Sequence, residues 1–415
     1  MQGRRRAELV AMNAYWFGLS YLWNGLGPLV LPLLVGRLVA EGARGTALGA
    51  LTAVGMLVAI VVQPVAGAIS DRSTNRAGRR RPYMLGGTLA DLVFLVGIAL
   101  APQYWVLLGA YFGLQVASNV AHGPYQGLIP DRVPPERRGQ ASGVKQFAEI
   151  LGIIVTSQAT GWLLSAGQVT WAVGVIALML LLTLAATLWG VREDPLARQV
   201  HEPLLRTVLQ TFRVDLGRYG GFAWLVVSRL FILVGMNLVR NYLLYYMEFI
   251  LHVTPEQAAG LAGSLLAILA VAIAAVVYPA GALSDRLGRK PLVVCSGLVG
   301  AAGSLLLLLV RTYTHLLLFG GVLGLAIGVF LSANWALLMD AIPDAEAGRY
   351  LGISNLATAG AGAVAGVGGW VLDFFNAQAP GRGYVALYLL AAACFAVGTG
   401  LLARVREPRR VRVAA

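Results

Sequence analysis

Long apolar stretches separated by short polar breaks follow one another from residue 12 to residue 403. A helix of about 20 apolar residues crosses the hydrocarbon core of a bilayer, whereas apolar runs in soluble proteins are shorter. Backbone polar groups cannot be left unpaired in lipid, so stretches of this length are expected to be helical throughout. The pattern therefore predicts an all-α integral membrane protein.

Twelve transmembrane helices are expected when the chain is divided at its charged breaks and at its Pro- and Gly-rich breaks. Their ranges are 12–35, 46–70, 83–101, 104–129, 140–165, 170–190, 221–250, 256–283, 292–310, 315–340, 350–375 and 384–403. An even number of crossings places both termini on the same side of the membrane.

The composition excludes several classes of protein. Only 12% of the 415 residues are charged and 58% are hydrophobic, whereas charged residues make up about 25% of a soluble enzyme. The two cysteines, Cys295 and Cys394, lie in apolar runs, so neither a disulfide framework nor a metal site is expected. The sequence has no nucleotide-binding loop or metal-ligand cluster, and we expect neither an enzyme nor a cofactor.

The basic residues gather on one side of the expected membrane. Of the 32 Lys and Arg, 25 fall on the side that carries both termini, four fall on the other side and three fall within spans. Cytoplasmic loops of membrane proteins carry such an excess of basic residues. We therefore expect a multi-pass plasma-membrane protein with both termini in the cytoplasm, and the charge gives no reason to expect a nucleic-acid partner.

The chain consists of two similar halves. Gly67-Ala-Ile-Ser-Asp71-Arg72 recurs as Gly281-Ala-Leu-Ser-Asp285-Arg286, and Asp131, Pro134 and Gly139 recur 209 residues later as Asp340, Pro343 and Gly348. Repeats of this length predict two six-helix bundles in the same orientation. The expected units are residues 1–190, a cytoplasmic linker over 191–220 with an amphipathic helix on the membrane face, and residues 221–415.

These motifs resemble those of a known family. Gly281-x-x-x-Asp285-Arg286-x-Gly288-Arg289-Lys290 is similar to the loop motif of the major facilitator superfamily, whose layout is also twelve helices as two sixes. The longer first-half loop, residues 71–82, and the motif Asn119-x-x-x-x-Pro124-Tyr125 resemble the sucrose and glycoside–cation symporter branch. The resemblance implies the major facilitator fold, with two pseudo-symmetric bundles.

A conformational latch is the role that the resemblance implies for the loop motifs. An aspartate at the inner end of a helix can pair with a basic residue or a helix N-terminus of the same half. Such a pair is expected only when the cytoplasmic ends of the helices are together. The alternative is that the arginines only satisfy the charge bias of the loops. The expected latch residues are Asp71, Arg72, Asp285, Arg286 and Arg289.

Charged residues within the spans need a partner or a watery cavity, because each costs about 2.5 to 3.5 kcal/mol at mid-bilayer. Lys145 and Glu149 lie one turn apart, on one face of the fifth span, and Arg229 reaches a similar depth from the other half. This predicts a polar cavity between the halves. Glu149 is the candidate proton-coupling residue, with His122 as a second one; the alternatives are a static ion pair and a satisfied histidine.

Polar side chains also recur at helical spacing in the first and seventh spans, as in Tyr21 and Asn24 and again in Asn241 and Tyr245. Amide and aromatic groups suit a polyol, because they offer hydrogen bonds and flat apolar surfaces. The expected substrate-binding residues are Tyr21, Asn24, Asn119, His122, Gln126, Lys145, Gln146, Arg229, Arg240, Asn241, Tyr245, Asn334, Trp335 and Asn355.

The sequence thus predicts a monomeric secondary transporter that moves a small polar solute, such as a sugar or glycoside, by alternating access and with proton coupling. Its partners would be a small-molecule substrate, protons and the lipid bilayer. The second span, residues 46–70, lacks the paired aspartates of sodium-coupled sugar carriers, which disfavours sodium. Two alternatives stay open: an exporter of amphipathic drugs or lipids, with an apolar, aromatic cavity, and a transporter-like sensor or assembly factor that binds without flux.

Overall fold

The computed structural model describes residues 2–134, 137–191, 193, 220–340 and 347–405, and every regular element in these residues is a helix. The first half begins with three consecutive helical segments that form one membrane crossing. They are α1 (Gln2–Gly25), the π-helix η1 (Leu26–Val30) and α2 (Leu31–Leu38). The short η2 (Glu41–Ala43) leads into α3 (Arg44–Ser70), α4 (Arg81–Ala99), α5 (Tyr104–Gln126), α6 (Leu128–Arg132), α7 (Arg138–Ser165) and α8 (Val169–Gly190).

In the second half two membrane crossings are interrupted. The first is formed by α10 (Gly220–Asn241) and α11 (Leu243–Leu251), and the other by α15 (Ala347–Ala365) and α16 (Val367–Asn376). The remaining helices are α12 (Pro255–Leu287), α13 (Arg289–Leu306) with η4 (Leu307–Leu309), α14 (Tyr313–Asp340) and α17 (Arg382–Leu401) with η6 (Leu402–Arg404).

Each of the twelve expected ranges contains a helix. Among the described residues, eleven helical segments are long and apolar enough to cross a membrane. The expected crossing that is not among these eleven is the fourth, α5. This helix is 23 residues long but carries the polar residues Gln115, Asn119 and His122. It packs between α3 and α4, so most of these polar groups are sheltered by neighbouring helices.

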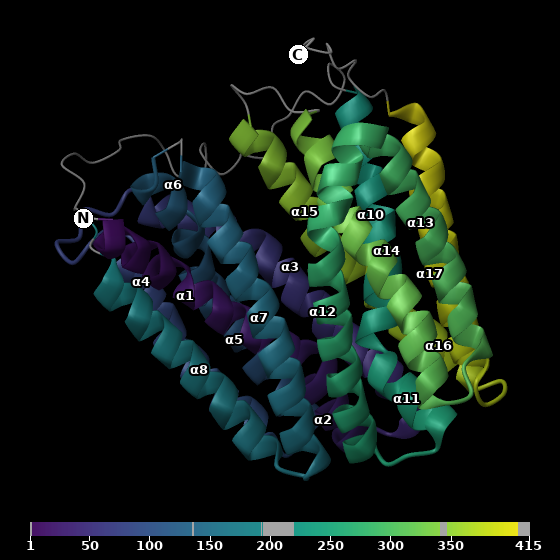
Figure 1. Ribbon diagram of the computed structural model, residues 1–415. Helices are drawn as coiled ribbons and strands as arrows, with labels where there is room; N and C mark the ends of the chain where they lie inside the picture. The colour runs from purple at the N-terminus through teal and green to yellow at the C-terminus, as the bar shows by residue number, and fades with distance from the viewer. Residues whose placement is uncertain (1, 135–136, 192, 194–219, 341–346, 406–415) are drawn as a thin grey trace.

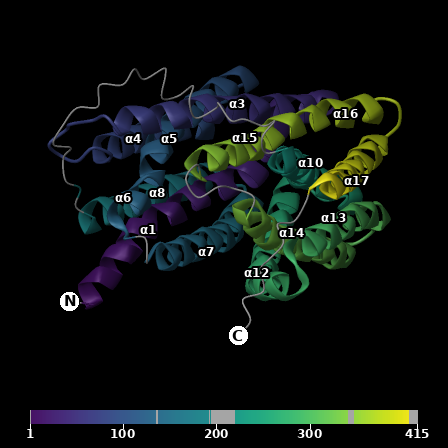
Figure 2. The ribbon, with the colours of Figure 1, turned by 90° about the horizontal axis from the view of Figure 1, so that it is seen from above.

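Figure 1 shows two helix bundles, one formed by α1 to α8 and the other by α10 to α17. The bundles converge where α2 and α11 lie and separate toward the end that carries the N-terminus. We call the latter end, with the loops at Arg80 and Arg289, the basic end, and the opposite end the distal end. Helix α7 packs against α12, and α3 packs against α15 and α16, so these pairs join the halves, as Figure 2 also shows.

Large apolar side chains cover the outward faces of both bundles. In the first half Trp105 and Trp171 are 70% exposed and Trp189 is 89% exposed, and in the second half Tyr278 and Val367 are 86% and 60% exposed. A water-soluble protein rarely shows so much apolar surface, whereas a bilayer is its natural environment. The helix expected in the linker falls on residues outside the described ranges, and the boundaries of the two units stay predictions.

Breaks in two helices shape the space between the bundles. Pro28 has no backbone N–H to donate, and the first crossing widens into the π-helix η1 around it. The seventh crossing is interrupted at Tyr242, whose hydroxyl donates to the carbonyl oxygen of Gly366 at 3.1 Å. Pro28 is four residues from Asn24 and Tyr242 is two residues from Arg240, and these two polar side chains face one another across the halves.

Candidate functional site

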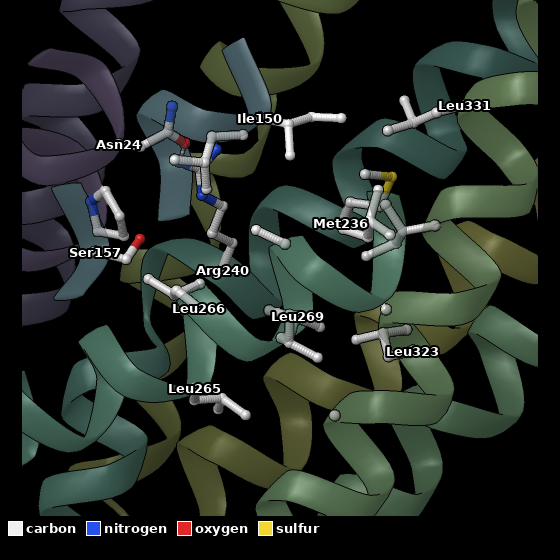
Figure 3. Close-up of a pocket in the computed structure, with 18 of the residues that line it drawn as sticks. Asn24, Ile150, Ser157, Met236, Arg240, Leu265, Leu266, Leu269, Leu323 and Leu331 are labelled. Atoms are coloured by element: carbon white, nitrogen blue, oxygen red, sulfur yellow. Dashed lines mark hydrogen bonds between the residues drawn. The ribbon is translucent and has the colours of Figure 1, made fainter. Parts of the chain in front are cut away.

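A cavity of about 680 Å³ lies between the two halves. Its wall is formed by α1, η1 and α7 from the first half and by α10, α11, α12, η4 and α14 from the second half. Pockets for small-molecule ligands commonly have volumes of about 300 to 1,000 Å³, so this cavity has the size of a binding site. Figure 3 shows part of its lining.

One side of the cavity is apolar. Helices α12 and α14 contribute rows of leucine and isoleucine, including Leu265 and Leu269. Gly320 and Gly324, one turn apart on α14, also line the cavity and face α12. A methyl group added at Gly324 would lie 2.9 Å from Leu269 Cδ2, so the absence of a side chain at this position lets α12 and α14 pack closely beside the cavity.

Three basic side chains, Lys145, Arg229 and Arg240, lie on the cavity wall, and none of the described residues that line it is Asp or Glu. Arg229 is only 7% exposed. Its Nη1 donates to Asn334 Oδ1 at 2.5 Å and its Nη2 to Thr358 Oγ1 at 3.5 Å, while its buried Nε has no partner. Among the described residues, this guanidinium therefore donates only to neutral groups.

Arg240 joins the two halves at the cavity. Its Nη2 donates to Asn24 Oδ1 at 2.6 Å, and Figure 3 shows the two side chains meeting on the side of Arg240 away from Leu266 and Leu269. Asn24 is oriented in turn by the bond from its Nδ2 to the carbonyl oxygen of Ser20 at 2.8 Å. The positive charge of Arg240 also faces a neutral partner.

Lys145 differs from both arginines, because a carboxylate offsets its charge. Its Nζ lies 3.4 Å from Glu149 Oε1 and 3.9 Å from the centre of the Trp16 ring. His122 packs edge-to-face on Trp16 at 5.1 Å, and Gln126 Nε2 lies 3.2 Å from His122 Nε2. These residues form a polar cluster within the first half, and Lys145 connects the cluster to the cavity.

Six of the expected substrate-binding residues lie on the cavity wall: Asn24, Lys145, Gln146, Arg229, Arg240 and Trp335. The remaining ones lie elsewhere. Asn334 accepts a hydrogen bond from Arg229 without lining the cavity, and Asn119 donates to the carbonyl oxygen of Gln115 in its own helix. Tyr21, His122, Gln126, Asn241 and Asn355 are not part of the wall, and neither is the expected proton site Glu149. Their roles in binding or coupling stay predictions.

Tyr245 also lies away from the cavity, where it belongs to a set of contacts that we call the distal contacts. Its hydroxyl donates to the carbonyl oxygen of Pro32 in the other half at 3.0 Å. The other distal contacts are the ion pairs Arg37–Glu256 at 2.9 Å and Arg44–Glu248 at 3.2 Å, and the bonds from the Gly45 and Thr46 amides to Asp373 at 3.1 and 2.6 Å. Together they hold the halves together at the distal end.

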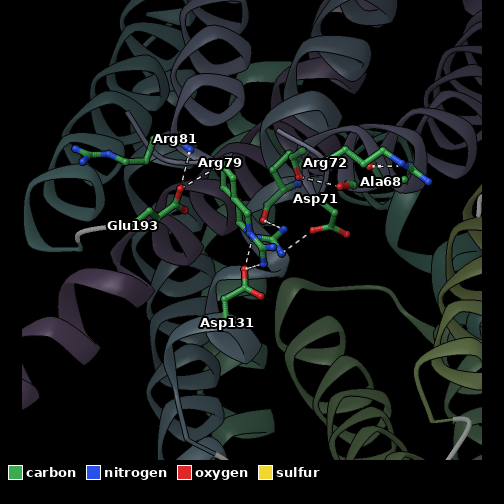
Figure 4. A network of polar contacts seen from close by, with 11 residues as sticks. Ala68, Asp71, Arg72, Arg79, Arg81, Asp131 and Glu193 are labelled. Atoms are coloured by element: carbon green, nitrogen blue, oxygen red, sulfur yellow. Dashed lines mark hydrogen bonds and ion pairs between the residues drawn. The ribbon is translucent and has the colours of Figure 1, made fainter. Parts of the chain in front are cut away.

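At the basic end the ion pairs seen between described residues lie within one half each. Arg80 pairs with Asp71 at 2.8 Å and with Asp131 at 2.6 Å, and Figure 4 labels both aspartates in the network. In the second half Arg289 pairs with Asp285 at 3.8 Å and with Asp340. The offset of 209 residues between the halves relates Arg80 to Arg289 and Asp131 to Asp340, so one arginine joins two aspartates in each half; in the first half Arg79 also pairs with Asp131.

These networks bear on the expected latch. Arg72 donates to the carbonyl oxygen of Ala68 in its own helix, and Arg286 is exposed. The pairs formed by Asp71 and Asp285 are present although the basic ends of the bundles lie apart in Figure 1. A latch role stays a prediction. Arg80 and Asp131 were not among the expected latch residues, although the 209-residue repeat marks both.

The fold and the central cavity are those of a membrane transporter. A family model described as "MFS/sugar transport protein" matches residues 35–401, and the chain therefore belongs to this family of the major facilitator superfamily. Its members are transporters and not enzymes. The resemblance to the sucrose and glycoside transporters, noted from the motifs, is confirmed.

Curated relatives and a solved structure agree with this assignment. The chain is 28% identical over 112 residues to the sucrose transport protein SUC3 of Arabidopsis thaliana, covering 22% of this chain and 19% of that protein. It is 29% identical over 155 residues to the general alpha-glucoside permease of Schizosaccharomyces pombe, covering 34% and 27%. The matches thus span about a fifth to a quarter of these relatives.

Among solved structures, a mutant of the nucleoside transporter NupG superposes with a TM-score of 0.77 at 14% sequence identity. The match covers 96% of this chain and 100% of that chain. At this identity the similarity shows the fold alone, and it confirms the predicted major facilitator fold.

Proposed function

We propose that this protein is a secondary transporter that moves a small polar solute of the sugar and glycoside class across the plasma membrane by alternating access. The observation that carries the proposal is the cavity between two bundles that meet through the distal contacts and separate toward the basic end. Transporters of this architecture bind their substrate between the two halves, near the middle of the membrane. The positive-inside bias assigns the basic end to the cytoplasm.

Polar groups on the wall support a hydroxylated solute. Asn24, Gln146 and Asn237 offer amide donors and acceptors, and Trp335 offers a flat apolar face of the kind that stacks on sugar rings. The names of two relatives, a sucrose transport protein and an alpha-glucoside permease, point to the same class of solute.

Proton coupling belongs to the same proposal. Glu149 is one turn from Lys145, and Lys145 lies on the cavity wall. A solute or a conformational change that draws Lys145 away would leave Glu149 without its cationic partner, which favours proton uptake by the carboxylate. Proton loading would then accompany the switch between the two conformations.

Counterflow in proteoliposomes tests the proposal. Purified protein is reconstituted into vesicles that contain unlabelled sucrose or maltose, and entry of the labelled sugar is followed with and without a pH gradient. We expect saturable counterflow that empty vesicles lack, and a pH gradient should drive accumulation. Binding of a solute without any flux would contradict the proposal and favour a sensor or assembly factor.

The apolar side of the cavity favours a second candidate function, the export of amphipathic compounds. A simple polyol makes little use of the leucine rows on α12 and α14, whereas an amphiphile would bury its apolar part there. Efflux of a preloaded amphiphile from cells, with loss of sugar counterflow in vesicles, would favour this candidate over the first.

A further inference from the structure

We propose that the transported solute is an amphipathic anion, with a carboxylate or phosphate group that binds the arginines of α10 and an apolar body that lies against α12 and α14. This inference rests on the proposed function, because it takes the cavity between the halves as the transport site. It adds a charge and an apolar part to the class of solute.

The cavity carries an excess of positive charge. Arg229 and Arg240 have neutral partners, Asn334, Thr358 and Asn24, and the described lining contains no acidic side chain. An uncompensated guanidinium in a poorly solvated site is costly, so such groups in membrane proteins commonly mark a ligand or a pathway. Lys145 does not add to the excess, because Glu149 lies 3.4 Å from it.

Arg229 also has unused hydrogen-bonding capacity. This side chain is more than nine-tenths buried, and its Nε has no partner in the structure. A guanidinium presents its N–H groups in a fixed fork that matches the two oxygens of a carboxylate or the oxygens of a phosphate. An anion would supply both the missing acceptor and the missing negative charge.

The spacing of the two arginines shows that they form separate positions. They are eleven residues apart on α10, which is about three helical turns and roughly 16 Å along the axis. Both therefore lie on one face of the helix, one nearer the basic end and the other beside Asn24. An anion entering from the basic end would meet Arg229 first and could pass to Arg240, where it would compete with Asn24 for the guanidinium.

An apolar wall shares the cavity with the second arginine. The lining includes Leu243, Leu265 and Leu323 as well as Gly320 of α14. Figure 3 shows Arg240 in the same view of the lining as Leu266 and Leu269. A solute with a charged group at the arginine can therefore place an apolar body against the leucines of α12 and α14.

Three matched probes test the anionic part. They are 4-nitrophenyl β-D-glucoside, the corresponding glucuronide and the corresponding 6-phosphate, which share the ring and the aryl group and differ only at carbon 6. We expect one of the two anions to bind purified protein about tenfold more tightly than the neutral glucoside in calorimetry. The better of the two identifies carboxylate or phosphate as the charged group.

Arginine variants connect the preference to the cavity. Arg229→Gln and Arg240→Gln should each reduce the preference for the anion, by about tenfold for the one that holds it, whereas Arg240→Lys, which keeps the charge and loses the fork, should retain only part of it. Arg311→Gln, at an exposed position outside the cavity, is the matched control and should change nothing. Equal binding of neutral and anionic probes, or a preference that survives in both glutamine variants, would overturn the inference.

Glycine variants test the apolar part. Gly320→Leu should fill part of the cavity on its apolar side and weaken binding of the aryl glucuronide more than that of glucuronic acid, which has no aryl group. Gly321→Leu is the control, because a side chain there meets open space. Equal weakening of both ligands would place the aryl group elsewhere and overturn this part.

Transport and binding separate the two proposals. Preferential binding of the anion without counterflow would contradict the proposed transport function and leave the inference about the ligand intact. Counterflow of neutral sugars with no preference for the anions would support the proposed transport function and contradict the inference about the ligand.

Discussion

Glu149 is the acidic side chain that offsets Lys145 beside the cavity, at 3.4 Å. The carbonyl oxygen of the same residue accepts a hydrogen bond from Ser20 Oγ at 2.7 Å, so α1 and α7 are fixed to one another at this point. The backbone therefore stays in place when the side chain is changed, which makes Glu149 suitable for a test of coupling alone.

We expect Glu149→Gln to retain counterflow and to lose accumulation driven by a pH gradient. The amide keeps the shape of the side chain and cannot take up a proton as a carboxylate does. Counterflow and pH-driven uptake in proteoliposomes are the two measurements, and Glu8→Gln, a change in an acidic residue remote from the cavity, is the control. Accumulation that persists in Glu149→Gln would remove this residue from the coupling mechanism.

Asp91 presents a different residue-scale problem. It is fully buried in α4, and neither carboxylate oxygen has a hydrogen-bond partner. A buried ionised carboxylate without a partner costs several kcal/mol, so the group makes no evident contribution to stability in its charged form.

We expect Asp91→Asn to leave the melting temperature of the purified protein unchanged or to raise it by a few degrees, because the amide removes the ionisable group at nearly constant volume. Thr88→Val, nearby on the same helix, removes the 2.6 Å hydrogen bond with the Tyr15 hydroxyl and should lower the melting temperature. A clear loss of stability in Asp91→Asn that matches the loss in Thr88→Val would show that the carboxylate has a stabilising partner.

At the scale of elements, the junction between α3 and α16 holds the distal end closed. A methyl group added at Gly369 would lie 1.9 Å from the Gly45 carbonyl oxygen, and one at Gly49 would lie 2.0 Å from the Gly366 carbonyl oxygen. Small residues let two helix backbones approach this closely. Asp373 adds a cap across the junction, because it accepts from the first amides of α3.

Gly369→Ala should therefore open the distal end. Overpacking of this kind costs about 1–3 kcal/mol, which changes the ratio of the two conformations at least about fivefold. Spin labels on cysteines at Gln103 and Gln378, which are exposed on opposite halves near the distal end, would report the distance by electron resonance in a background with Cys295→Ser and Cys394→Ala. Gly321→Ala, where a methyl group meets nothing within 4 Å, is the control. An unchanged distance distribution in Gly369→Ala would show that the junction does not hold the closed state.

Element boundaries were predictable from the sequence, and the interruptions were not. Apolar length places helices such as α7 and α14 within two residues of their expected ranges, because the bilayer sets that length. The break at Gly366 lies where α3 of the other half packs closely, and the break at Tyr242 is accompanied by a hydrogen bond to Gly366, 124 positions away, so no local pattern encodes either break.

The same distinction holds within the site. Lys145 and Glu149 are four residues apart on one helix, so their contact follows from local geometry. The bonds from Arg229 to Asn334 and from Arg240 to Asn24 join residues 105 and 216 positions apart, and only the packing of the bundles brings them together. An apolar cavity was expected only for the alternative of an exporter, and the glycines Gly320 and Gly324 mark where α14 packs closely on α12 beside it.

At the scale of the whole molecule, the sequence repeat places an equivalent ion-pair network in each half. Arg80 is 5% exposed and its guanidinium joins Asp71 at the end of α3 to Asp131 in α6, while Arg289 joins Asp285 in α12 to Asp340 at the end of α14. Each network thus connects helix ends within one rigid half. A contact of this kind stabilises the half in every conformation in which the half moves as a unit.

This arrangement separates two roles by experiment. If each network only stabilises its own half, Arg80→Gln should lower the melting temperature and leave the distance between the basic ends unchanged. If the network is a latch, the same variant should change that distance. Labels on cysteines at Ala77 and Leu287, in the same cysteine-free background, would report it. We expect a lower melting temperature and an unchanged distance, because the pairs are already formed while the basic ends are apart.

The loss of stability on replacing the central arginine should also differ between the two halves. Arg80 is more buried than Arg289, with side chains 6% and 17% exposed, and its pair with Asp71 is shorter, 2.8 Å against 3.8 Å. Because both aspartates are more than half exposed, solvent screening reduces the effect, and we expect a loss of about 1–3 kcal/mol for Arg80→Gln and less for Arg289→Gln. Thermal unfolding of the two variants, read against Arg311→Gln, measures the difference. A larger loss in Arg289→Gln would mean that the second network, despite its longer pair, carries more of the stability of the molecule.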